Sequence, residues 1–196
     1  THNHLLRQVS LLEESLEEKL RQVCVSEKIM DLNKLQKNSH AWQLEIFHHW
    51  IKKVTNQSLS YQRTHAVLDA LLGAKEDRYP SESFATYKLM RYRRLAALCI
   101  LPESDLSISN SNERICLGEY GALLNPSKKQ VSVKLLGEAT GAYKKRFQAM
   151  GIPAWLRAKL PCVYIDSLAL VGPLKIYEAD VTWVPPEDWL YWLSYS

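Results

Sequence analysis

The sequence predicts an α+β fold: an N-terminal helical domain with a β-hairpin, then a small C-terminal α+β domain of antiparallel strands with one main helix. The early part of the chain repeats apolar residues every three or four positions, which is typical of amphipathic helices. Later segments are short and rich in strand-forming residues. A polar, serine-rich stretch at residues 102–113 separates the two patterns, so we place the domains at residues 1–104 and 112–196.

The first helix is predicted over residues 4–24. One side of this segment is apolar and the other carries several glutamates, as expected of a helix half exposed to water. The apolar side consists of Leu5, Val9, Leu12, Leu16, Leu20 and Val23. Residues 29–35 follow as a short extended connection.

Two further helices are expected after serine N-caps, Ser39 and Ser60, and the second of them should end at Gly73. His48 and His49 lie on the first of these helices. Adjacent helical residues point about 100° apart, so this pair is not expected to chelate one metal ion. We therefore predict no metal site in the chain.

A β-hairpin is predicted over residues 83–101, where strand-forming residues alternate with cations. A helix over residues 86–98 is the competing interpretation, because leucine and alanine in this segment favour helices. The cations are Lys88, Arg91, Arg93 and Arg94, and they are interleaved with Tyr87 and Tyr92.

The second domain should contain short strands on both sides of one helical unit at residues 141–161. Gly151 is expected to stop its first helix in a left-handed conformation, and Pro153 to occupy the first position of a second turn. In the aromatic tail, packing of Trp189 and Trp192 on the sheet is favoured over a docking edge. The strands are expected at residues 114–117, 121–124, 130–135, 162–165, 168–171, 174–177 and 181–183.

Composition excludes several classes of protein. The four cysteines form no Cys-x-x-Cys pair, so we expect buried free thiols and a reducing, cytoplasmic compartment. There is no apolar run long enough to cross a membrane. The sequence also lacks a nucleophilic-serine motif and a phosphate-binding loop, so we predict no catalytic residues and no cofactor site in this chain.

The remaining chemistry is cationic, since the net charge is +4. Cations next to aromatic residues are typical of surfaces that contact phosphates and stack on exposed bases, although a solvated helix face has the same composition. Trp155 and Tyr92 could stack on bases or serve structure. The cations of the two clusters that we expect to contact phosphates are Arg91, Arg93, Arg94, Lys144, Lys145, Arg146, Arg157 and Lys159.

Two stretches resemble the tRNA(Ile)-lysidine synthetase family. The first comprises residues 41–51, 59–71 and 89–95, which are similar in order to the family's middle, substrate-binding domain. The second is residues 144–164, Lys-Lys-Arg-Phe-Gln-Ala-Met-Gly-Ile-Pro-Ala-Trp-Leu-Arg-Ala-Lys-Leu-Pro-Cys-Val-Tyr, which is similar to the family's C-terminal signature.

The resemblance implies the tRNA-binding part of a ligase. The family uses ATP, with Mg²⁺, to activate the anticodon wobble cytidine of tRNA(Ile), and L-lysine then displaces AMP. ATP and L-lysine bind an N-terminal domain that this chain is expected to lack, so its own partner would be tRNA(Ile). A standalone RNA-binding or protein-binding module, including a homodimer, is the alternative, and a small independent enzyme is the third hypothesis.

Overall fold

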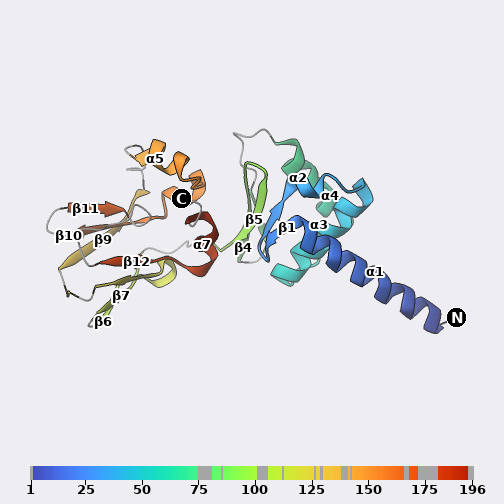
Figure 1. Cartoon of the computed structure of the whole chain (residues 1–196), viewed down its shortest axis with the longest axis horizontal. Helices are drawn as coiled ribbons and strands as arrows, with labels where there is room; N and C mark the ends of the chain where they lie inside the picture. Colours follow the sequence, from blue (N-terminus) through green and yellow to red (C-terminus); the bar gives the residue numbers. More distant parts are fainter. Residues whose placement is uncertain are drawn as a thin grey trace. The chain divides into compact units, whose positions relative to one another are not determined.

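The computed structural model describes residues 2–74, 81–84, 86–100, 106–111, 113–125, 127–128, 130–137, 141, 143–165, 168–171 and 181–193. The chain divides into two compact units, Thr1–Leu101 and Pro102–Ser196 (Figure 1). Both combine helices with antiparallel strands, so the predicted α+β class is confirmed. The strand expected at residues 174–177 lies outside the described residues.

In the first unit, helices cover one face of a five-stranded antiparallel sheet with the order β1-β2-β5-β4-β3. Helix α3 lies at the centre, and its Trp50, Phe47 and Ile51 side chains are almost completely buried. The elements are α1 (His2–Val23), β1 (Cys24–Ser26), β2 (Ile29–Asp31), α2 (Leu32–Leu35), α3 (His40–Thr55), α4 (Tyr61–Gly73), β3 (Ser81–Phe84), β4 (Tyr87–Tyr92) and β5 (Leu95–Cys99).

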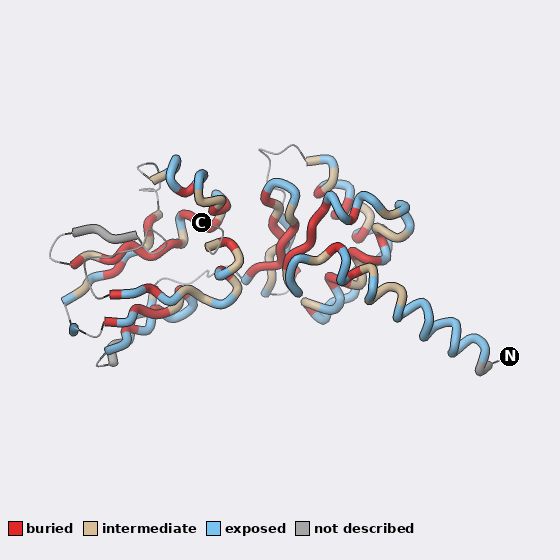
Figure 2. The backbone as a smooth tube through the Cα atoms, in the orientation of Figure 1, coloured by how far each residue is buried: buried red, intermediate tan, exposed pale blue. Residues whose placement is uncertain are grey.

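Helix α1 packs on the unit only through its C-terminal half. Its Leu20 and Val23 are buried, whereas Leu5 and Leu12 are largely exposed and lie on the part that extends away from the unit (Figure 2). The predicted helix at residues 4–24 is therefore correct. The apolar stripe that identified it is only partly covered within the described residues.

The extended connection predicted over residues 29–35 is wrong in its second half. Strand β2 ends at Asp31, whose carboxylate accepts hydrogen bonds from the backbone N–H groups of Asn33 (3.0 Å) and Lys34 (3.2 Å). This N-cap starts the short helix α2, because it satisfies two donors that have no partner within the helix. The apolar residues that suggested a strand are the buried face of that helix.

The predicted hairpin is correct, and the competing helix is wrong. Tyr92 pairs with Leu95, so the turn between β4 and β5 is formed by Arg93 and Arg94. Arg93 adopts φ 54°, which belongs to the turn types that match the right-handed twist of hairpin strands.

The second unit contains two antiparallel sheets, β11-β10-β9 and β12-β8-β7-β6. Strand β6 lies inside the stretch that we predicted to be a linker, because its backbone pairs with β7 although its residues are polar. The elements are β6 (Ser109–Ser111), β7 (Arg114–Cys116), the 3₁₀ turn η1 (Gly118–Tyr120), β8 (Ala122–Leu124), β9 (Val131–Leu135), α5 (Lys144–Ala149), α6 (Ala154–Arg157), β10 (Pro161–Ile165), β11 (Leu168–Val171), β12 (Thr182–Val184) and α7 (Glu187–Leu193).

The tail is the helix α7, and its Trp189 and Trp192 are buried at 2% and 4% exposure. The packed interpretation of the tail is therefore correct. The expectation for the thiols holds only in part. Cys99 and Cys162 are buried, but Cys116 is exposed because it lies on the outer side of the short strand β7.

Candidate nucleic-acid interface

The turn of the β4–β5 hairpin presents two arginines to solvent, Arg93 and Arg94. The Arg93 guanidinium lies 5.2 Å from the centre of the Tyr92 ring, and Tyr92 itself is 7% exposed. The Arg94 side chain is 65% exposed and its Nε is 3.4 Å from Oδ2 of Asp31. We call Arg93 and Arg94 the hairpin arginines. The Tyr92 ring packs against the Arg93 guanidinium, and because the ring is buried it leaves little surface on which a base could stack.

Arg91 is half-buried and makes contacts within the unit, so its assignment to RNA contact stays a prediction. Alternation along β4 puts it on the same face as buried Leu89, toward the helices. Its Nη1 donates to the carbonyl oxygens of Leu71 and Ala74 (2.7 Å to Ala74), at the end of α4. Its Nε donates to the carbonyl of Arg93 (2.9 Å). Arg91 therefore joins α4 to the hairpin through its Nε and Nη1 donors.

In the second unit, α5 presents three consecutive exposed cations, Lys144, Lys145 and Arg146. The helix is anchored by Phe147, which is completely buried, and the Tyr143 ring lies 5.9 Å from the Phe147 ring. We call the three residues the α5 cations. Since they are adjacent, their side chains spread over roughly 200° of the helix surface. This spread would allow them to contact several phosphates along a curved nucleic-acid backbone.

Arg157 has a structural role in the second unit, and its assignment to RNA contact stays a prediction. It is 8% exposed, and both its Nε (2.9 Å) and its Nη2 (2.7 Å) donate to the carbonyl oxygen of Ile152. These bonds close the turn between α5 and α6. Gly151 provides the predicted left-handed turn with φ 70°, whereas Pro153 is the N-cap of α6 rather than its first helical residue.

Trp155 also serves the fold. Its ring meets the Trp192 ring edge to face at 5.7 Å, so α6 packs on α7 through the two indoles. Lys159 is half-buried and lies two residues after the end of α6. The exposed cations of the predicted clusters are thus the hairpin arginines and the α5 cations.

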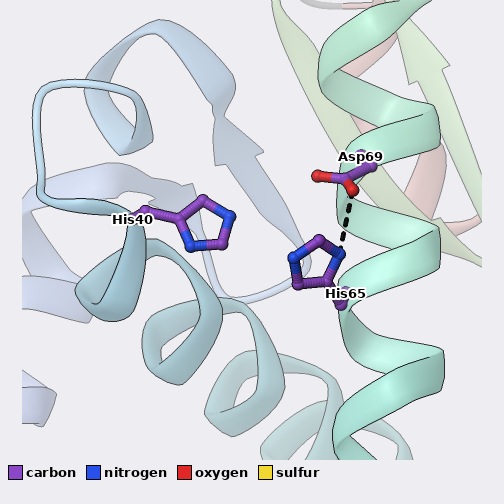
Figure 3. Close-up of side chains that lie close together, drawn as sticks. All are labelled: His40, His65 and Asp69. Carbon is purple, nitrogen blue, oxygen red and sulfur yellow. Dashed lines mark ion pairs between the residues drawn. The ribbon is translucent and has the colours of Figure 1, made fainter.

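The adjacent histidines His48 and His49 contact different groups. Nε2 of His49 lies 2.8 Å from Glu17 and Nε2 of His48 lies 3.2 Å from the Ser58 hydroxyl, so the adjacent pair does not converge. Sequence interpretation missed another group, in which His40 lies beside His65 and Asp69 (Figure 3). The spacing of four between His65 and Asp69 was the available signal, because it places both on one face of a helix.

Within the described residues, no helix combines the length and the apolar character that crossing a bilayer requires.

Comparison with known proteins gives a match to the TilS substrate binding domain over residues 30–95, from β2 to the start of β5. The tRNA(Ile)-lysidine synthase of Serratia proteamaculans is 25% identical over 211 residues, which cover 94% of this chain and 48% of that protein. Those of Legionella pneumophila strains Paris and Lens are 24% and 26% identical over 71% of this chain and 38% of theirs. The chain spans about half the length of the first of these relatives and a smaller share of the other two. The comparisons confirm the resemblance to the tRNA(Ile)-lysidine synthetase family.

Proposed function

We propose that this chain binds and positions tRNA(Ile) as part of a tRNA(Ile)-lysidine synthetase, which ligates lysine to the anticodon wobble cytidine at the expense of ATP. The observation that carries the proposal is the match to a substrate-binding domain over residues 30–95, because this range contains the hairpin arginines. Their exposure in the matched domain supports contact with an anionic substrate.

The α5 cations extend this proposal to the second unit. They are exposed, adjacent and held on a buried anchor, which suits contacts to phosphates more than contacts to individual bases. ATP and L-lysine would bind a separate catalytic domain, and the reaction would take place in the cytoplasm. A standalone binding module is less favoured, because relatives with the synthase activity match across both units.

The direct test is the affinity for the minor isoleucine tRNA, measured by fluorescence anisotropy over a range of salt concentrations. Each neutralised phosphate contributes about 0.7 to 0.9 to the slope of log K against log salt. If Lys144 and Lys145 contact phosphates, the double substitution Lys144→Glu/Lys145→Glu should reduce this slope by about 1.5 and weaken binding at least about tenfold.

A matched control has the same change in net charge. Lys37 and Lys52 are exposed lysines of the first unit outside both proposed surfaces. The Lys37→Glu/Lys52→Glu protein should keep the slope and most of the affinity. Equal losses in the two double variants would show that only net charge matters and would reject the α5 surface.

Arg93→Gly tests the hairpin without a penalty in folding. The residue has φ 54°, a conformation that glycine adopts more easily than arginine, so the variant should be at least as stable as the parent. Binding should nevertheless weaken, because one exposed cation is lost. Undiminished affinity in this variant would remove Arg93 from the proposed interface.

A further inference from the structure

His40, His65 and Asp69 converge from two helices of the first unit. His40 is the first residue of α3, directly after Ser39, while His65 and Asp69 lie one turn apart on α4. Nδ1 of His65 is 2.9 Å from Oδ2 of Asp69, and the two imidazole rings are 5.2 Å apart. Figure 3 shows the His40 ring directed toward the other two side chains.

The three donor atoms have the spacing of a metal site that is close to assembled. One ligand atom from each residue lies within 4.8 Å of the others. In a tetrahedral site with bonds of about 2.0–2.1 Å, the ligand atoms are about 3.3 Å apart. The longest separation must therefore shorten by no more than about 1.5 Å. Rotation of the side chains can supply this, because those of His65 and Asp69 are 42% and 56% exposed.

The backbone positions of the donors are fixed by the core. Leu44 on α3 and Leu68 on α4 are buried in the same apolar cluster, so the two helices hold the donor-bearing residues at a constant separation. Only the side chains need to reorganise, and their loss of conformational freedom is one cost of binding. A rigid frame with adjustable ligands is a favourable basis for a metal site.

The donor set selects the kind of ion. Two imidazole nitrogens and one carboxylate oxygen suit Zn²⁺ and neighbouring transition metals, whereas Mg²⁺ and Ca²⁺ prefer oxygen ligands throughout. We propose that His40, His65 and Asp69 bind one Zn²⁺ ion, with water in the fourth position. The ion links the start of α3 to α4 and stabilises the helical layer of the unit.

The test uses Zn²⁺ itself, titrated into the full chain by isothermal calorimetry, with Co²⁺ as a spectroscopic substitute. A Cys116→Ser background removes the exposed thiol, a competing zinc ligand. We expect one ion per chain and the intense visible bands of four-coordinate Co²⁺. His40→Gln and His65→Gln should each weaken binding at least about a hundredfold, and Asp69→Asn at least about tenfold.

His48→Gln is the matched control, since His48 lies on α3 but contacts Ser58, and it should leave binding unchanged. Zn²⁺ should also raise the unfolding temperature of the parent but not that of His65→Gln. Binding that survives in both His40→Gln and His65→Gln would overturn the proposal, as would equal weakening by His48→Gln. All three ligand positions are outside the core, so circular dichroism should show folded variants.

Discussion

The substitution Arg157→Met tests whether Arg157 stabilises the fold or contacts RNA. The substitution keeps most of the aliphatic side chain but removes both donors to the Ile152 carbonyl oxygen. Hydrogen bonds from a charged donor contribute about 1.5–3 kcal/mol each, and bonds that share one acceptor do not add fully. Because the residue is 8% exposed, water cannot easily replace the lost donors. We therefore expect the second unit to lose about 2–3 kcal/mol of unfolding free energy.

The assay is urea unfolding of the full chain, fitted with separate transitions for the two units, combined with tRNA affinity measured well below the midpoint. Lys145→Met is the matched control, because methionine here replaces an exposed cation on α5 instead of the buried Arg157. It should leave the midpoint unchanged and weaken tRNA binding, which is the opposite of the pattern expected for Arg157→Met. An Arg157→Met protein with unchanged stability and weaker tRNA binding would refute our reasoning.

Two further predictions concern acid stability and thiol reactivity. Hydrogen bonds from Lys53 and then His49 lower the pKa of Glu17 below its ordinary value of 4.5, so the folded state binds fewer protons than the unfolded state in this range. This stabilisation is present above pH 4.5 and is lost as the pH falls through the lowered pKa. Glu17→Gln should flatten that part of the stability profile and cost less than about 1 kcal/mol at pH 7 in urea unfolding, because Glu17 is 37% exposed; an unchanged acid profile would contradict this. For the thiols, iodoacetamide should alkylate exposed Cys116 first, as followed by peptide mass spectrometry, because burial raises the pKa of Cys24 to about 12; faster labelling of Cys24 would contradict the assignment.

The long elements could be predicted because local and tertiary requirements agree there. The helices after Ser39 and Ser60 start where serine precedes a periodic apolar segment, and Ser60 caps α4 by accepting a bond from the Arg63 N–H. The hairpin was predictable for the same reason, since the alternation of apolar and polar residues and the short polar turn both indicate a β-hairpin. Helix α2 was not, because one side-chain cap decides its four residues.

Composition alone could not show which cations are exposed and which make contacts inside a unit. Alternation placed Arg91 beside Leu89, which was a usable signal, but the carbonyl groups of Leu71 and Ala74 come from a helix distant in sequence. Similarly, nothing local shows that His40 meets His65, since the two residues are 25 positions apart and are joined only by packing of α3 on α4.

The signature at residues 144–164 combines two physical tasks that its sequence does not separate. Phe147, Gly151 and Arg157 fix the path of the chain between α5 and α6: one fills the core, one supplies the left-handed turn and one closes that turn. Such residues tolerate little change, because each satisfies a requirement of the backbone or of the core. The α5 cations are exposed and are not needed to fix the path of the chain. Substitutions there should therefore alter the affinity for tRNA while the fold persists. Resemblance to a signature therefore indicates a common fold of this segment first, and exposure within that fold identifies the residues that are available for the proposed contact with RNA.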